Sequence, residues 1–280
     1  MKPVEAHLSS GWQAELHLGF TRRGEATLLS DCRHRGPLRV QKALYPEGEA
    51  VCQAIVLHPP SGIAGGDHLN IHVDAASGAR AQCTTPGAGK WYRSGGPDAS
   101  QRLHFRVADE AVLEWLPQET IVFDGARAHM DTRVRLTGAA RYIGWDILCL
   151  GRAAAGERFR QGRIDLSCRI ERDGRPIWLE RGSLHGDDPM LASPAGWGGA
   201  TVCATLIATA PPAPDLLAAC RAIAPADGAR HALTALPGVL IARYLGDSSE
   251  AARLWLADIW TLLRPAILGR PALPPRIWNT

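Results

Sequence analysis

Apolar and polar residues alternate with a period of two through most of the first 210 residues, and this pattern constrains the fold more than any other feature. Leucine, phenylalanine and valine alternate with arginine and histidine in QRLHFRV (101–107), and DTRVRL (131–136) repeats the pattern. Such segments are typical of strands with one buried face, because successive side chains point to opposite faces of a sheet. RYIGWDILCLG (141–151) is apolar at both parities, which predicts a central strand covered on both faces. We therefore predict a mainly β fold.

One hairpin can be placed from its turn. In RIDLSCRIERDGRPIWLER, Asp173 and Gly174 separate two alternating runs and favour a two-residue type I′ turn, in which both residues have positive φ. An uninterrupted ladder from this turn pairs Cys168 with Leu179 on the core face. The same register places Glu180 on the opposite face, off the core.

Helical spacing replaces the alternation after the proline-rich segment APPAPD. Asp215 is the predicted N-cap of a first helix, and Asp247 with Glu250 forms a predicted capping box for a second. Apolar residues then recur at helical spacing from Leu254, and Pro265 is expected to end the helix. We predict a small number of α-helices, mostly near the C-terminus.

The chain is predicted to form a single domain over residues 1–280, with a β-rich part at 1–210 and a helix-containing part at 211–280. The bend at 211–214 is too short to be a linker. The composition, with 46% apolar residues, is sufficient for a sizeable core at this length.

Charge, hydropathy and cysteine content exclude several classes of protein. A net charge of +3 is far below the dense basic field that nucleic-acid binding needs, so no nucleic-acid partner is expected. The N-terminal residues lack the apolar run of a signal peptide and no later run is long enough to cross a bilayer, so neither secretion nor a membrane is expected. The seven cysteines are scattered, without a C-x-x-C pair, and predict a reducing cytoplasm rather than a disulfide framework or zinc module.

The glycine-rich stretches HPPSGIAGGD (58–67) and TTPGAGKWYRS (84–94) do not match a nucleotide-binding loop. A P-loop requires glycine where Thr84 stands and serine or threonine where Trp91 stands. The glycines of the first stretch lack the dinucleotide-binding spacing and precede a predicted strand rather than a helix. Nucleotide binding is therefore not predicted.

Hydrolytic and metal sites are also poorly supported. The chain has no G-x-S-x-G elbow, and Ser61 lies in a Pro-Gly turn without a sign of an activating base. We expect no enzymatic activity, although an unrecognised hydrolase that uses His58 and Asp67 is one alternative. His68 and His72 would stand about 13 Å apart on one strand face, at ~3.3 Å per residue, which is too far to share one metal ion.

Asp67 is the anomalous residue of this region. It has the parity of Leu69, Ile71 and Val73, so its carboxylate points toward the apolar side, where burial is costly unless the group is hydrogen-bonded, paired or hydrated. One explanation is that Asp67 caps the turn at the two preceding glycines, which is a common local use of aspartate. The other is that it lines a wet interior. The residues alone leave both open.

Seven segments resemble, in order and spacing, the UreD family of urease accessory proteins, called UreH in some organisms: HPPSGIAGGD, TTPGAGKWYRS, LEWLPQETIVFDGA, GWDILCLGRAAAGE, WLER, ALPGVLIARYLG and PRIWNT. The resemblance runs from near residue 20 to the C-terminus, and these long segments have an unusual composition. Ser61 is a departure, since the family more usually has glycine there. The resemblance implies a mostly β fold whose strands form sheets in a helical stack, with a few helices.

The resemblance also implies a function. Members of the family are expected to be non-enzymatic scaffolds and metallochaperones that help to insert nickel into apo-urease. Their implied partners are UreF, the GTPase UreG through UreF, the nickel carrier UreE, and apo-urease itself. No permanently bound cofactor is expected, but transient binding of Ni²⁺ is. A free-standing metal-binding protein is the second alternative.

An internal wet passage for nickel is implied for this family, and its matching acidic residues here are Asp67 and Glu180. Carboxylates suit such a passage because they bind a hydrated divalent ion weakly enough to release it. For Glu180, the alternative is a surface glutamate screened by Arg169 and Arg181.

The segment KWYRS is a predicted partner-binding surface. Lys90, Trp91, Tyr92 and Arg93 together have the composition of an interface hot spot. The alternative is a strand end that Trp91 anchors in the core.

Overall fold

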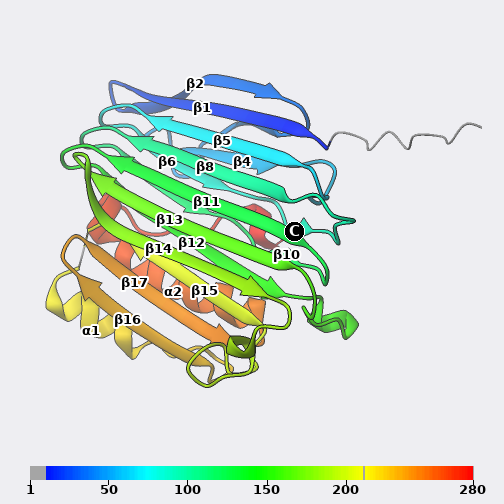
Figure 1. The fold of residues 1–280 in the computed structure, drawn as a ribbon. Coiled ribbons are helices and arrows are strands. Elements are labelled where there is room, and N and C mark those ends of the chain that lie inside the picture. The colour runs from blue at the N-terminus through cyan, green and yellow to red at the C-terminus, as the bar shows by residue number, and fades with distance from the viewer. Residues whose placement is uncertain (1–10, 211, 280) are drawn as a thin grey trace, which may run out of the picture.

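The alternating segments form strands, and these strands build two β-sheets that lie face to face (Figure 1). The computed structural model describes residues 11–210 and 212–279. Within this part of the chain the fold is mainly β, as predicted, with two α-helices and three short 3-10 helices.

The seven-stranded sheet contains the following strands in spatial order: β14 (Arg175–His185), β13 (Arg163–Arg172), β11 (Arg127–Leu136), β8 (Ala99–Val107), β5 (His68–Ala75), β1 (Gln13–Arg23) and β2 (Ala26–Arg35). The ten-stranded sheet has the order β16 (Arg230–Leu236), β17 (Val239–Gly246), β15 (Val202–Ala208), β12 (Arg141–Leu150), β9 (Val112–Leu116), β6 (Arg80–Thr84), β4 (Cys52–Leu57) and β3 (Arg39–Leu44). Two short strands complete it, β10 (Thr120–Val122) beside β12 and β7 (Gly89–Trp91) beside β10.

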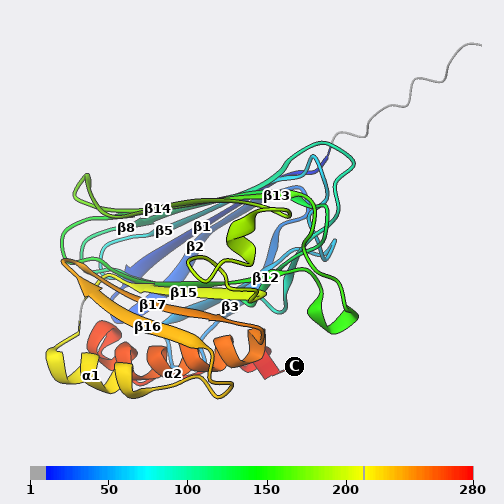
Figure 2. The ribbon, with the colours of Figure 1, turned by 60° about the horizontal axis from the view of Figure 1, so that its bottom comes forward.

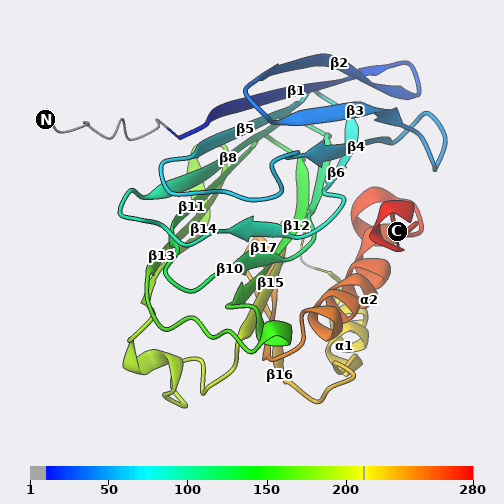
Figure 3. The ribbon, with the colours of Figure 1, turned by 90° about the vertical axis from the view of Figure 1, so that its right-hand side faces the viewer.

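The chain passes back and forth between the two sheets and so winds into stacked coils. Strands β5, β8, β11 and β13 are parallel neighbours in one sheet, and β4, β6, β9 and β12 are parallel neighbours in the other. Each coil therefore stacks on the previous one, as the view along the sheets shows (Figure 3). The helical stack of strands implied by the family resemblance is confirmed.

Two apolar cores hold these layers together. One lies between the sheets and includes Leu16, Phe105 and Val134, whose side chains are buried on alternate positions of their strands. The other lies between the ten-stranded sheet and the helices α1 (Pro214–Ala222) and α2 (Ser249–Leu268), which cover the sheet's outer face (Figure 2). Strand β12 is central and buried on both faces, as the apolar run at 141–151 predicts.

The helix termini differ from the predicted ones. Asp215 lies in the first turn of α1 rather than at its N-cap, and Ser248, not Asp247, caps α2 by accepting a hydrogen bond from the Ala251 N–H. Helix α2 continues through Pro265 to Leu268, with Gly269 as its C-cap. Pro265 is exposed, but Ile267 and Leu268 after it are buried, and this packing outweighs the hydrogen bond that proline cannot donate. In the described residues, neither helix is long and apolar enough to cross a membrane.

The 211–280 part also contributes strands β16 and β17, which the sequence interpretation did not place there. Its helices pack on the same sheet that these strands extend, so the β-rich and helix-containing parts share the second apolar core.

The hairpin β13–β14 contains a bulge that corrects the predicted register. Asp173 and Gly174 have the expected positive φ, and Arg172 pairs with Arg175. The register then shifts between Ile170 and Glu171, so Cys168 lies opposite Glu180 rather than Leu179. Because β14 has one extra residue at the bulge, every later side chain of β14 points to the face opposite to the predicted one. The prediction that Glu180 lies off the core face was therefore wrong.

Candidate functional site

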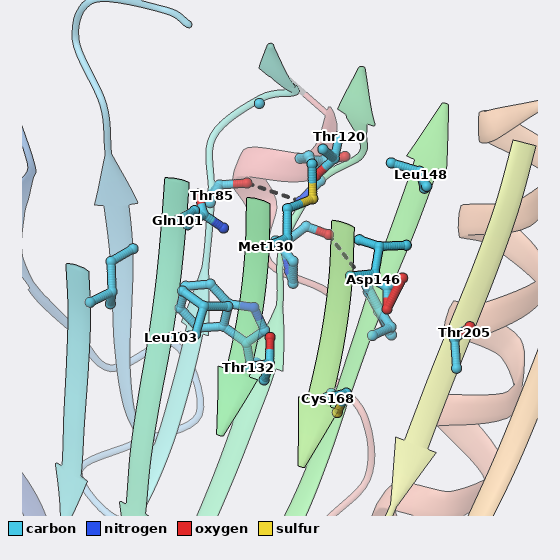
Figure 4. Close-up of a pocket in the computed structure, with 18 of the residues that line it drawn as sticks. Thr85, Gln101, Leu103, Thr120, Met130, Thr132, Asp146, Leu148, Cys168 and Thr205 are labelled. Carbon is cyan, nitrogen blue, oxygen red and sulfur yellow. Dashed lines mark hydrogen bonds between the residues drawn. The ribbon is translucent and has the colours of Figure 1, made fainter. Parts of the chain in front are cut away.

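A cavity of about 580 Å³ lies between the two sheets. It crosses the strands from β4 and β5, through β8, β11 and β12, to β14 and β17. Figure 4 shows Met130, Thr132 and Cys168 from the seven-stranded sheet and Asp146 and Thr205 from the ten-stranded sheet around this space. A pocket of this size is large enough for a chain of water molecules. The space between the stacked coils is lined mainly by apolar side chains, with polar and charged groups among them.

Both carboxylates of the cavity, Asp146 and Glu180, lie at its β14–β17 end. Asp146 pairs in register with Thr205, and Thr205 pairs with Arg243, so all three line one row of the ten-stranded sheet. Across the cavity, the Glu180 carboxylate forms an ion pair with the Arg243 guanidinium and accepts a hydrogen bond from it. This ion pair joins the two sheets at the end of the cavity.

Asp146 is enclosed by protein but exposed to the cavity. Burial, and then the negative charge of Glu180, raise the pKa of its carboxyl to about 7, against the opposing charge of Arg243. Its carboxylate accepts no hydrogen bond from the described residues. Asp146 can therefore change its charge near neutral pH, and it is free to interact with whatever enters the cavity.

Two thiols lie beside these groups. Cys168 and Cys203 come from opposite sheets and both line the cavity. Burial is the main cause that raises the pKa of each thiol, and the charge of Asp146 adds to it. Both side chains are therefore protonated at neutral pH while no cation is bound.

Asp67 occupies a different place from Glu180. Its Oδ1 accepts a hydrogen bond from the Trp12 N–H at 2.7 Å, and its Oδ2 accepts one from the Ala64 N–H at 2.8 Å. The side chain is buried as predicted, but it is not among the described residues that line the cavity. The contacts are those of a turn cap, which also fixes the start of β1 against this turn.

His58 lines the other end of the cavity. Its Nε2 is buried and has no hydrogen-bond partner among the described residues. Burial lowers the pKa of the imidazole, while the negative charge of Asp67 opposes that shift. In the described part of the chain the His58 imidazole makes no hydrogen bond to the Ser61 hydroxyl, which donates to the Pro59 carbonyl instead, and the two residues are joined only through the Ser61 N–H and the His58 carbonyl. This arrangement does not assemble an activated serine.

The glycines of HPPSGIAGGD serve close packing. A Cβ at Gly62 would lie 2.3 Å from the Tyr92 ring, and Gly66 adopts a φ of +93° that favours glycine. Ser61 has a φ of +65°, a left-handed conformation that glycine adopts with less strain than serine. The stretch is a tight turn that packs against the segment following β7, rather than a phosphate cradle.

The predicted partner-binding segment is only partly exposed. Trp91 is buried in the core between the sheets, Tyr92 packs edge-to-face on Phe123 at 5.2 Å, and the exposed Arg93 is paired with Asp124 at 3.2 Å. Lys90 lines the cavity. The surface that this segment can offer to a partner therefore consists of Lys90, Tyr92 and Arg93, with Trp91 as their anchor.

No group of three or more histidine, cysteine, aspartate or glutamate side chains in residues 11–210 and 212–279 is arranged to hold a metal ion. The carboxylate oxygens at the β14–β17 end are of the ligand type that hard divalent cations prefer.

Comparison with known proteins decides the family. The sequence model of the family described as "UreD urease accessory protein" matches residues 13–279. The chain belongs to the UreD family.

Several UreD relatives cover nearly the whole chain. A urease accessory protein UreD from Dechloromonas aromatica is 70% identical over 97% of this chain and 96% of its own length. Relatives of the same name from an Azoarcus species and from Pseudomonas fluorescens are 53% and 54% identical, over 96% and 98% of this chain and 95% and 98% of their own lengths. The family resemblance that the sequence segments show is confirmed.

The sequence interpretation missed Asp146 and Arg243 in this UreD chain. Each is a charged residue within an apolar segment, RYIGWDILCLG and ALPGVLIARYLG. A charge is costly to bury unless it is paired or hydrated, so a single charge in an apolar strand is the signal that could have found both residues.

Proposed function

We propose that this chain is a scaffold and metallochaperone for the insertion of nickel into apo-urease. Membership of the UreD family supports a role in urease maturation, and the relatives are named as accessory proteins, which supports a role without catalysis. In this proposal the chain binds UreF, recruits UreG through UreF, and contacts apo-urease. The absence of a P-loop motif from the sequence accords with a nucleotide that belongs to UreG.

The observation that supports the metal-handling part is the cavity between the sheets. It crosses the stack and carries Asp146 and Glu180 at one end and His58 at the other. Oxygen ligands hold a hydrated divalent ion weakly, so nickel can enter such a space as cargo and leave it again. We propose that Ni²⁺ passes through this cavity and that Glu180 is one of the groups it meets.

Asp67 acts in this proposal as a support for the passage. Its two hydrogen bonds hold the turn at residues 64–67, next to the residues from His58 to Ile63 that line the cavity. We also propose that the chain is located in the cytoplasm, because its free cysteines accord with a reducing compartment.

The test is co-expression of this chain with UreF, UreG and apo-urease, followed by size exclusion and urease activation with nickel and GTP. Activation should require this chain and should fall in Glu180→Gln and Asp146→Asn while the complex stays intact. Glu171→Gln is the matched control, because Glu171 is also an ion-paired glutamate of the β13–β14 hairpin but pairs with Arg169. Equal activation by Glu180→Gln and Glu171→Gln would refute nickel passage, and activation without the chain would refute the function.

A second experiment separates the alternatives. A free-standing metal-binding protein should hold nickel tightly in the absence of partners, whereas the proposed scaffold should bind it weakly. A hydrolase that uses His58 and Asp67 should lose turnover in His58→Ala, whereas the scaffold has no turnover to lose.

A further inference from the structure

The ion pair between Arg243 and Glu180 has an unusual position. The two residues belong to opposite sheets, on β17 and β14, and both line the end of the cavity. Their side chains are 44% and 32% exposed, so the pair is accessible to water. A partly exposed ion pair is weak enough to be exchanged for another partner.

A second carboxylate shares this cation. Asp146 lies in the row of Thr205 and Arg243 on the same sheet, and Arg243 is the cation that favours its ionised form. The charge of Glu180 acts in the opposite direction on Asp146. Glu180 thus holds the guanidinium directly, whereas Asp146 interacts with it only through charge. The guanidinium also lies 6.0 Å from the Trp178 ring.

We propose that Arg243 competes with a divalent cation for Glu180 and Asp146. This inference rests on the proposed passage of nickel through the cavity. The guanidinium occupies Glu180, so an incoming divalent cation must displace it and is held only weakly. Without Arg243, a divalent cation would itself neutralise the two carboxylates and would be retained. Arg243 therefore sets the affinity at this end low enough for release.

The neighbouring thiols do not supply the binding in this account. Burial raises the pKa of Cys168 and Cys203, so each thiol would have to lose its proton at an added cost before it could bind the cation. The chemistry of the site is that of hard oxygen ligands, and the predicted cargo is a hydrated divalent cation.

The test is a calorimetric titration of the full chain with NiCl₂ above neutral pH, where Asp146 is ionised. Arg243→Gln should bind Ni²⁺ about tenfold or more tightly than the wild type, because a competing charge is lost. Arg243→Gln combined with Glu180→Gln should lose this gain. Arg169→Gln is the matched control. Arg169 is paired with Glu171, and both lie on β13, the strand next to β14, so this variant should leave the affinity for Ni²⁺ unchanged.

Equal affinity of Arg243→Gln and wild type would overturn the inference. If Arg243→Gln does not fold, Arg243→Lys decides the matter, because lysine keeps the competing charge and should bind within about threefold of the wild type. A tenfold gain in Arg243→Lys would overturn the inference as well.

The activation assay keeps this inference distinct from the proposed function. Tighter binding by Arg243→Gln in a system where urease activation does not need this chain would support the inference and refute the function. Unchanged binding together with activation that needs Glu180 would refute the inference and support the function.

Discussion

Arg264 on helix α2 and Glu114 on strand β9 form an ion pair in which both side chains are fully buried. Glu47 gives the guanidinium a second carboxylate, and Trp260 donates its indole N–H to Glu114 at 2.7 Å. This network fixes the C-terminal helix to the ten-stranded sheet. It also helps α2 to keep its last turn despite Pro265, because Arg264, the residue before the proline, is fixed by its ion pairs with Glu47 and Glu114.

Removal of the cation alone should be severe. Arg264→Met leaves Glu114 and Glu47 without their partner and should lower the free energy of unfolding by about 3–5 kcal/mol. The double variant Arg264→Met with Glu114→Gln should be less destabilised, because one buried charge is removed as well. Urea denaturation measures both. Equal losses in the single and double variants would contradict this account.

Asp67 should contribute to stability rather than to metal affinity. Asp67→Ala leaves the N–H groups of Trp12 and Ala64 without an acceptor, and should lower the free energy of unfolding by about 1–3 kcal/mol. Asp67→Asn should also lose stability, because its amide NH₂ would face one of the two donors. Thermal unfolding of the apo chain checks this. A variant with unchanged stability but weaker nickel binding would instead make Asp67 a ligand.

Asp146 should make stability depend on pH. Its pKa is raised from 3.8 to about 7 in the folded chain, so the folded state favours the protonated form. The stability that it contributes is therefore present below pH 4 and is lost as the pH rises toward 7. Water in the cavity reduces the effect, and Asp146→Asn should stabilise the chain by about 1 kcal/mol at pH 8.

The control for this prediction is the pH itself. The melting temperatures of the wild type and Asp146→Asn should converge as the pH falls toward 4. A gap of constant size across this range would show that the amide acts through packing and not through the charge.

The cavity should make its thiols accessible to small reagents. Methylmercury should label the exposed Cys32 first, Cys168 and Cys203 next, and the buried Cys83 last, as peptide mass spectrometry can follow. A bulky maleimide should label Cys32 only. Labelling of Cys168 and Cys83 at one common rate would mean that access occurs through unfolding and that the cavity is closed to solvent.

Much of the fold could be predicted from the sequence because it depends on local patterns. Alternation in 101–107 and 131–136 identifies half-buried strands, and the continuous apolar run at 141–151 identifies the central strand. The assignment of successive strands to two different sheets depends on pairing between distant segments, and no local pattern records it. The family resemblance, not the periodicity, gave that arrangement.

The candidate site shows the limit of arguments from parity. Pro176 follows the turn directly and cannot donate a ladder hydrogen bond, so the register shifts beside it and Glu180 turns inward. Parity predicted the inward direction of Asp67 correctly, but could not show that backbone N–H groups satisfy it. Contacts between residues far apart in sequence decided which carboxylate meets the cavity.

The stack of parallel coils leaves strand edges at which a further strand could pair. A parallel edge could accept another coil of the same kind and extend without limit. Here β2 and β14 fold back antiparallel at the two edges of the seven-stranded sheet, and so interrupt the repeating pattern. The hairpins β1–β2 and β13–β14 therefore end the stack on its two sides. They limit the number of coils, and with it the length of the cavity that crosses them.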